Sequence, residues 1–227
     1  MTCPVGFGRL HQVREEMRHC GKTYHEFMLG SPRDRKVRER FQRLVLQVVP
    51  PHGTILDFGA GTGIDAARYA AEGFRVLVHE PSDANLAYLG EHCRQQIASG
   101  SIAITDLTDV RSVEMIVANF AVLNLICDHR ALFAKFAGLL APGGFVLASL
   151  LNPFFLGDAR YAWWRRNLPT LLANGAYTVE GEFDRIHRFA PYVVGRAARP
   201  DFKVLTCVPA WPRLAASRYV FTLFQKQ

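Results

Sequence analysis

The chain has 227 residues, of which 49% are hydrophobic and 21% are charged. This length suits one α/β domain with an appended segment, and the composition excludes a mainly disordered chain. The formal net charge of +7 fits an anionic partner or simply an arginine-rich composition, and we favour the second interpretation.

The cysteines and the apolar runs indicate the cellular compartment in which the chain is expected. Five cysteines are scattered through the chain without a CxxC pair, and no secretory segment opens it. This pattern predicts a reduced, cytoplasmic chain with neither a zinc site nor a disulfide framework. No apolar run reaches the roughly 18–20 residues of a membrane span. No two histidines have metal-ligand spacing, so we predict no metal.

Residues 1–50 are predicted to form a helical segment ahead of a sheet. Residues 1–22 are polar and partly helical, and residues 34–49 have the apolar period of a helix. The apolar stripe consists of Val37, Phe41, Leu44, Val45 and Val48. The other sides carry Arg33, Arg35, Lys36, Arg38, Arg40 and Arg43. We interpret these cations as a solvated helix face, with a nucleic-acid patch as the alternative.

The stretch from Thr54 to Glu72 combines a short apolar run, three glycines at alternate positions and an amphipathic helix. The run is typical of a buried parallel strand. Unpaired backbone N–H groups at the start of the following helix can bind a nucleotide-like ligand. Glycine is needed there because a Cβ would block the ligand or a turn with positive φ.

Strands alternate with helices from residue 54 to residue 151. Further strands are expected at 74–79, 102–104, 115–118 and 145–151, with helices at 83–97 and 130–140. This alternation predicts a parallel sheet with right-handed crossovers. Residues 152–185 are rich in aromatic residues and are interpreted as a mostly helical inserted cap. A short helix is expected near 191–198. Strands at 186–189, 202–208 and 218–224 would complete the sheet, the last two as antiparallel neighbours at its edge.

The glycine spacing distinguishes between ligands. A dinucleotide loop, G-x-G-x-x-G, would place its third glycine at position 64, but that residue is Ile64 and the third glycine is Gly63. Asp57 would repel a pyrophosphate, whereas it can hold a cationic amine. The loop therefore predicts a ligand with an adenosine and a positively charged amino-acid end.

The segment Asp57-Phe58-Gly59-Ala60-Gly61-Thr62-Gly63 resembles the D/E-x-G-x-G-x-G loop of class I S-adenosylmethionine-dependent methyltransferases. Residues 140–144, Leu-Ala-Pro-Gly-Gly, are similar to the family's turn before the fifth strand. The resemblance covers about residues 54–151. It implies a Rossmann-like, mostly parallel seven-stranded α/β sheet with helices on both faces, and S-adenosyl-L-methionine as cofactor.

The resemblance also implies cofactor contacts at the strand ends. Glu80, followed by Pro81, can accept both ribose hydroxyls. Asp106 can reach the adenine amino group and Leu107 can offer its N–H to the ring, with Asp109 as the competing acid. Asn119 and Phe120 would lie beside the sulfonium, and Tyr24 lies on a segment that folds over the cofactor. The predicted cofactor residues are Tyr24, Asp57, Gly59, Ala60, Gly61, Gly63, Glu80, Pro81, Asp106, Leu107, Asn119 and Phe120.

The sequence says less about which residues bind and activate the methyl acceptor. His25, His129 and His187 are the candidate general bases, because imidazole titrates near neutrality, and each is alternatively a surface or core histidine. Trp163, Trp164, Arg165 and Arg166 are predicted to bind substrate in an aromatic lid, or alternatively to pack the cap or form a dimer face.

We therefore predict a single methyltransferase domain: a lid (1–50), a cofactor core (54–151), a cap (152–185) and C-terminal strands (186–227). It would methylate a small-molecule acceptor and release S-adenosylhomocysteine, and a homodimer is left open. The alternatives are a nucleic-acid methyltransferase, which we disfavour, a non-catalytic cofactor-binding protein and a nicotinamide-dependent oxidoreductase.

Overall fold

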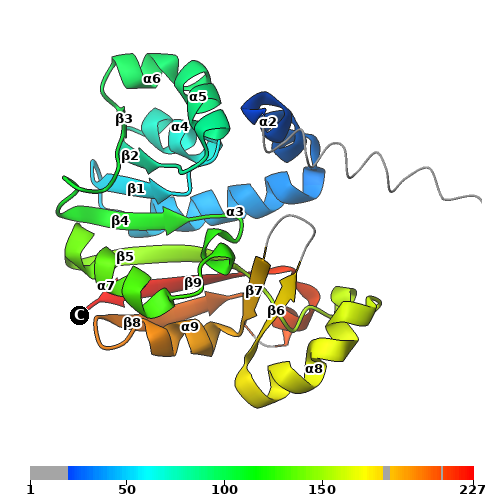
Figure 1. The fold of residues 1–227 in the computed structure, drawn as a ribbon. Helices are drawn as coiled ribbons and strands as arrows, with labels where there is room; N and C mark the ends of the chain where they lie inside the picture. The colour runs from blue at the N-terminus through cyan, green and yellow to red at the C-terminus, as the bar shows by residue number, and fades with distance from the viewer. Residues whose placement is uncertain (1–19, 181–184, 211) are drawn as a thin grey trace, which may run out of the picture.

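A seven-stranded sheet forms the centre of the molecule (Figure 1). The computed structural model describes residues 20–180, 185–210 and 212–227. The strand order is β3-β2-β1-β4-β5-β9-β8. The strands are β1 (Thr54–Phe58), β2 (Arg75–His79), β3 (Ile102–Ile104), β4 (Val113–Ala118), β5 (Leu140–Leu151), β8 (Phe202–Val208) and β9 (Tyr219–Lys226). Strands β1 to β5 are parallel, and β9 is antiparallel to β5 and β8, which confirms the predicted fold class.

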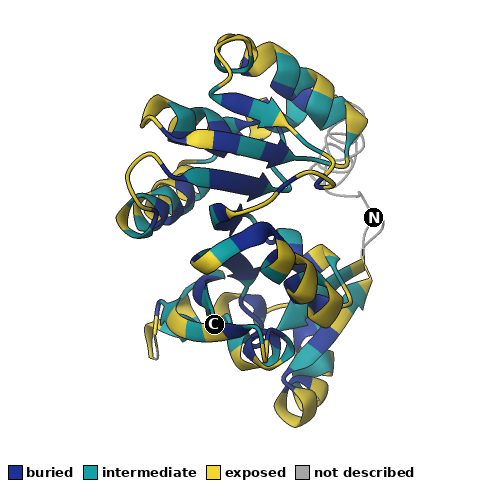
Figure 2. Ribbon diagram, turned by 90° about the vertical axis from the view of Figure 1, so that its left-hand side faces the viewer, coloured by how far each residue is buried: buried dark blue, intermediate teal, exposed yellow. Residues whose placement is uncertain are grey.

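Helices cover both faces of this sheet. They are α3 (Pro32–Val48), α4 (Ile64–Ala71), α5 (Asp83–His92), α6 (Arg94–Ala98), α7 (His129–Leu139) and α9 (Pro191–Ala197). A further helix, α2 (Gly21–Gly30), packs against α3 and α5. One hydrophobic layer joins the sheet to α3, α4 and α5, and the other joins it to α7 and α9. Ile55 belongs to the first layer and Leu56 to the second, as the alternation of a strand requires. Figure 2 shows the buried strands between helices whose outer sides are exposed.

Strand register brings three loops to one edge. Phe58 at the end of β1 is opposite His79 at the end of β2, and Asp57 is opposite Val117 on β4. Because these strands are parallel, the loops that follow them lie at the same edge. This is the edge at which doubly wound sheets bind their ligands.

The cap differs from the prediction in one respect. Helix α8 (Ala162–Asn174) is followed by β6 (Ala176–Glu180), which pairs antiparallel with β7 (Arg185–Phe189) in a separate two-stranded sheet. Residues 186–189 therefore do not extend the main sheet, and the strand at β6 was not predicted. The left-handed Gly175 ends α8 and turns the chain directly into β6, which supplies β7 with a nearer partner.

Several predicted boundaries shift. The helix predicted over 83–97 is interrupted at Cys93, between α5 and α6. Strand β5 begins at Leu140, so the predicted turn at 141–144 lies within it as a register irregularity opposite Val113 and Met115. The helical prediction for residues 1–19 falls outside the described residues.

Candidate active site

A pocket lies at the carboxyl ends of β1 and β4, and we call it the loop pocket. Its lining comes from the loop after β1, from the end of β4 and from α2 and α3. The lining residues are Tyr24, Arg38, Asp57, Gly59, Ala60, Gly61, Thr62, Ile64, Asp65, Asn119 and Phe120. The space between them is about 20 Å³. Part of the predicted cofactor set is thus brought together by the fold.

The glycine loop is fixed onto the neighbouring strand. The N–H groups of Gly59 and Ala60 both donate to the carbonyl of His79, at 2.8 and 3.2 Å. Gly63 begins α4 at a φ of 79°, and a Cβ there would lie 2.7 Å from the Sγ of Cys93. Both the positive φ and the close packing therefore require glycine at this position.

Asp57 carries an unpaired acceptor in the loop pocket. Its side chain is 2% exposed, and its Oδ2 atom has no hydrogen-bond partner among the described residues. Burial raises the pKa of this carboxyl well above its ordinary value, and the nearby Asp65 carboxylate raises it further. A cationic donor bound beside Asp57 would give Oδ2 its missing hydrogen bond and would favour the ionised form of the acid.

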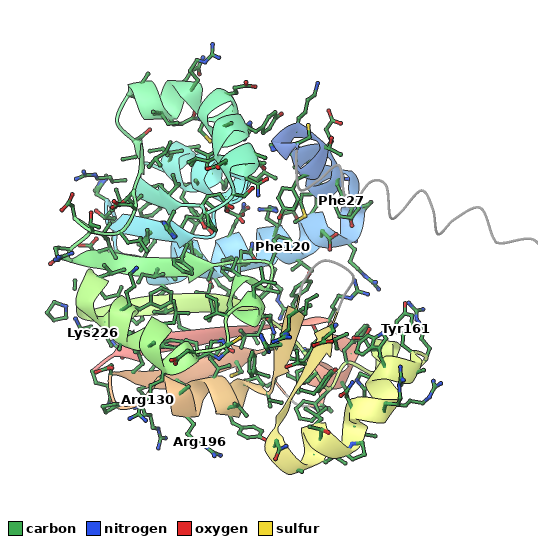
Figure 3. The ribbon with its side chains drawn as sticks, in the orientation of Figure 1. Phe27, Phe120, Arg130, Tyr161, Arg196 and Lys226 are labelled. Carbon is green, nitrogen blue, oxygen red and sulfur yellow. The ribbon has the colours of Figure 1, made fainter. Side chains whose placement is uncertain are left out.

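Arg38 is buried in the loop pocket, so its predicted place on a solvated helix face is wrong. Its Nη1 atom donates to Asp65 Oδ2 at 2.5 Å, and Asp65 is also bound by Gln42 and Asn119. The guanidinium lies 4.5 Å from the centroid of Phe120. Figure 3 shows Phe120 at the end of β4, beside α3. The stripe that buries Phe41 and Val45 also buries Arg38, because the three lie at helical spacing on α3.

The loop pocket therefore presents two unsatisfied groups of opposite kind. Within the described chain, Asp57 Oδ2 lacks a donor and Arg38 Nε lacks an acceptor. An α-amino acid end carries an ammonium and a carboxylate, and it can satisfy both groups at once. The predicted ligand, an adenosine with such an end, fits this pair.

Glu80 contacts the same loop from the end of β2. Its Oε2 atom accepts from the Gly61 N–H at 2.7 Å, and its Oε1 atom accepts from the Ser82 N–H at 2.9 Å. The next residue, Pro81, is exposed. The carboxylate is thus held beside the loop pocket, and its contact with a ribose stays a prediction.

The residues after β3 are engaged with their own loop. Asp106 is exposed, and its Oδ1 atom accepts from the N–H and hydroxyl of Thr108. Those bonds lower the pKa of Asp106. The Leu107 side chain is buried, and its N–H donates to Thr105 Oγ1 at 3.0 Å. The predicted Leu107 contact with adenine would require its N–H to leave Thr105, and the Asp106 contact stays a prediction. Asp109 is also exposed.

Helix α2 lies over the glycine loop. A Cβ on Gly61 would lie 3.3 Å from Cε1 of Tyr24. The adjacent His25 is buried, and its Nδ1 atom is 3.0 Å from Thr62 Oγ1. Burial lowers the pKa of His25, so it is mostly neutral at pH 7. Tyr24 therefore covers the loop where the sequence predicted a cofactor contact.

The other two candidate bases lie away from the glycine loop. His129 is buried at the start of α7, and its Nε2 donates to the Leu123 carbonyl at 2.9 Å. His187 lies on β7, with Nε2 at 2.9 Å from Cys127 Sγ and Nδ1 at 2.9 Å from Thr178 Oγ1. Burial lowers the pKa of His129. No contact joins either ring to the loop pocket among the described residues, so a catalytic role stays a prediction.

The predicted aromatic lid packs within the cap. Trp164 is buried, and its Nε1 donates to the Pro153 carbonyl at 2.9 Å. Trp163 stacks on Tyr161, with 5.7 Å between ring centroids. Arg165 donates to main-chain carbonyls of the cap itself, and Arg166 is exposed. In Figure 3, Tyr161 lies well away from Phe120. The geometry favours the packing alternative over a substrate lid at the loop pocket.

Over the described ranges, with gaps at 181–184 and 211 and before residue 20, no three His, Cys, Asp or Glu side chains gather as a metal site. The same ranges contain no helix that is both long and apolar enough to cross a membrane.

Comparison with known proteins identifies the family. A family model described as a methyltransferase domain matches residues 30–182. The chain belongs to this methyltransferase family. A curated relative, the ubiquinone biosynthesis O-methyltransferase of Rhizobium etli strain CFN 42, is 26% identical over 169 residues, which cover 70% of this chain and 66% of the relative. The protein of the same name from strain CIAT 652 is 24% identical over 132 residues and is matched over 52% of its length. The chain thus spans less than two thirds of these relatives.

Solved structures share the fold. The CcbJ methyltransferase from Streptomyces caelestis has a TM-score of 0.60 at 20% identity, with 83% of this chain and 88% of that chain covered. An S-adenosylmethionine-dependent methyltransferase from Mesorhizobium loti has a TM-score of 0.55 at 19% identity, with 81% and 96% covered. The glycopeptide N-methyltransferase MtfA in complex with S-adenosylmethionine has a TM-score of 0.58 at 18% identity, with 84% and 94% covered.

Family and fold together confirm the class I methyltransferase predicted from the glycine loop, with S-adenosylmethionine as its cofactor. Four residues of the loop pocket were not predicted from the sequence: Arg38, Thr62, Ile64 and Asp65. The helical register of Arg38 with Phe41 and Val45 was a usable signal for the first, since all three share one side of α3.

Proposed function

We propose that this methyltransferase transfers the methyl group of S-adenosylmethionine to a small-molecule acceptor and releases S-adenosylhomocysteine. The observation that carries the proposal is the pair of unsatisfied groups in the loop pocket, Asp57 Oδ2 and Arg38 Nε. Buried polar atoms without partners are uncommon, and a ligand that pairs both removes a cost of about 1–3 kcal/mol for each.

The residues take complementary roles in this proposal. Asp57 accepts from the cofactor ammonium, and Arg38 donates to its carboxylate while keeping its bond to Asp65. Glu80 exchanges its bond with Gly61 for the ribose hydroxyls. The ring of Phe120 lies beside the amino-acid end, where an aromatic face suits a sulfonium cation. The bound cofactor supplies the electrophilic methyl, and the chain aligns the two reactants and excludes water.

Helix α2 acts as the lid in this account. Tyr24 covers Gly61, and the space left in the loop pocket is about 20 Å³. That space holds little more than a water molecule, so α2 must move outward to admit the cofactor. Tyr24 would then close over its amino-acid end.

A small molecule is the favoured acceptor because of the named relatives. Two curated relatives are ubiquinone biosynthesis O-methyltransferases, and one structural neighbour is a glycopeptide N-methyltransferase. The burial of Arg38 also removes a cation from the face on which a nucleic-acid acceptor would depend.

The test uses S-adenosylmethionine labelled with deuterium in its methyl group. The purified chain is incubated with a small-molecule extract or with total RNA, and the products are analysed by mass spectrometry. We expect labelled small molecules with the wild type and far less label with Asp57→Asn. Label confined to RNA would support the nucleic-acid alternative, and binding of S-adenosylhomocysteine without any labelled product would support the non-catalytic one.

A further inference from the structure

A second, larger pocket lies beside α3, and we call it the basic pocket. Its volume is about 470 Å³, within the range of roughly 300–1,000 Å³ that is usual for small-molecule sites. Arg33, Lys36 and Arg40 line it from α3, and Tyr219, Phe221 and Pro209 line it from the C-terminal strands. Tyr219 pairs with Leu151, the last residue of β5, so this pocket opens at the same edge of the sheet as the loop pocket.

One aromatic pair separates the two pockets. Phe120 lines the loop pocket and Tyr219 lines the basic pocket, and their rings meet edge to face with 5.7 Å between centroids. On α3, Arg38 lines the first pocket and its neighbour Val37 lines the second. A molecule in the basic pocket that reaches the ring of Tyr219 is therefore one side chain away from the proposed position of the sulfonium.

The lining is cationic at the rim and aromatic at the floor. The three cations are exposed, and no carboxylate is found among the described residues that line the pocket. Their spacing of three and four residues puts them on one side of the helix. Phe221 is buried, and the Arg40 guanidinium lies 6.0 Å from its ring centroid. Burial raises the pKa of Tyr219 to about 12, so its hydroxyl stays protonated and able to donate at neutral pH.

We propose that the basic pocket holds the methyl acceptor, and that the acceptor is a small organic anion with a flat apolar body. Its carboxylate or phosphate binds Lys36 and Arg40, with Arg33 at the outer rim, and its body packs against Phe221 and Tyr219. The reacting atom then lies against Tyr219, and the rings of Tyr219 and Phe120 separate to let it meet the methyl group. This inference rests on the proposed function, because it names the substrate class of that same site.

The test is ligand-observed NMR on the full chain saturated with S-adenosylhomocysteine. The probes are aromatic carboxylates and aryl phosphates, each with its neutral amide or alcohol counterpart; 3,4-dihydroxybenzoate and 3,4-dihydroxybenzamide form one such pair. The variant is Lys36→Gln with Arg40→Gln. The matched control is Arg35→Gln with Arg43→Gln, which removes the same charge from exposed positions of the same helix outside the pocket.

We expect acids to bind and their neutral counterparts to bind at least tenfold more weakly, since only the acids carry the charge that pairs with Lys36 and Arg40. The Lys36/Arg40 variant should lose about tenfold or more in acid affinity, and the Arg35/Arg43 variant less than about threefold. The inference is overturned if no acid binds, if acids and neutral counterparts bind alike, or if both double variants weaken binding equally. Calorimetry with S-adenosylhomocysteine on the same samples distinguishes failure of this inference from failure of the proposed function. If S-adenosylhomocysteine does not bind, the proposed function itself is wrong.

Discussion

Replacing Asp57 by Asn should weaken cofactor binding and stabilise the free protein, and the two effects have one cause. The carboxyl is 2% exposed, and its Oδ2 atom has no partner in the described chain. In Asp57→Asn a neutral amide takes the place of the ionised acceptor for the cofactor ammonium. Net values of about 1.5–3 kcal/mol for a charged hydrogen bond and about 0.5–1.5 for a neutral one differ by about 1–2 kcal/mol. The dissociation constant of S-adenosylhomocysteine should therefore rise by a factor of about 5–30.

The pH dependence of the free protein's stability tests the predicted stabilisation by Asp57→Asn independently. Burial raises the folded pKa of Asp57 above the unfolded value, so its stabilising contribution is complete below the unfolded pKa and is lost as pH rises through the folded pKa. At neutral pH the burial of this acid therefore destabilises the folded wild type, and Asp57→Asn removes that cost. The midpoint of thermal unfolding of the free variant should thus exceed that of the wild type at pH 7, and the difference should shrink towards pH 4.

Cofactor affinity should change with pH in the opposite direction. The ammonium favours ionised Asp57, so binding to the wild type should strengthen as pH rises through the raised pKa, whereas binding to Asp57→Asn should not. The assay is isothermal titration calorimetry from pH 5 to 8, with Glu91→Gln as an exposed charge-matched control. An unchanged dissociation constant in Asp57→Asn, or a control that weakens binding as much, would show that Asp57 does not bind the cofactor ammonium.

Three further substitutions separate the roles of site and core. Arg38→Gln leaves Asp65 buried without its cation, and urea unfolding should show a loss of about 3–5 kcal/mol together with weaker S-adenosylhomocysteine binding; undiminished stability would contradict the buried pair. Gly63→Ala forces a side chain to a φ of 79°, so its unfolding free energy should fall by at least about 1–2 kcal/mol, and a rise would show that the loop relaxes freely. Phe133→Ala removes a ring that is 1% exposed and belongs to the hydrophobic layer on the other face of the sheet. Its unfolding free energy should fall by about 3–5 kcal/mol, while calorimetry under native conditions should find an unchanged cofactor affinity.

Much of the sheet could be predicted because its signals are local. The glycine spacing and the short apolar runs located β1 and β3 at or close to their observed bounds, since a parallel strand needs only a few consecutive apolar residues. The bounds predicted for β8 also match the observed ones. The antiparallel edge formed by β8 and β9 was also predicted. These features depend on residues adjacent in the chain.

The features that could not be predicted depend on contacts between segments that are distant in the chain. Strand β6 follows a helix that ends at Gly175, and its partner β7 lies beyond it in the chain, so the apolar run at 186–189 alone could not show which sheet it would join. Arg38 looked like one of several helix-surface cations, and only its pairing with Asp65 from α4 makes its burial tolerable. The acceptor side was hardest, because the basic pocket combines α3 with strands about 180 residues later.

The most direct test of the account is a crystal structure of this chain with S-adenosylhomocysteine. We predict that the amino-acid end occupies the loop pocket, with its ammonium nitrogen about 3 Å from Asp57 and its carboxylate against Arg38. The ribose should lie beside Glu80, and α2 should be displaced outward from Gly61. A complex whose amino-acid end touches neither Asp57 nor Arg38 would show that the loop pocket is not the site of the cofactor's amino-acid end.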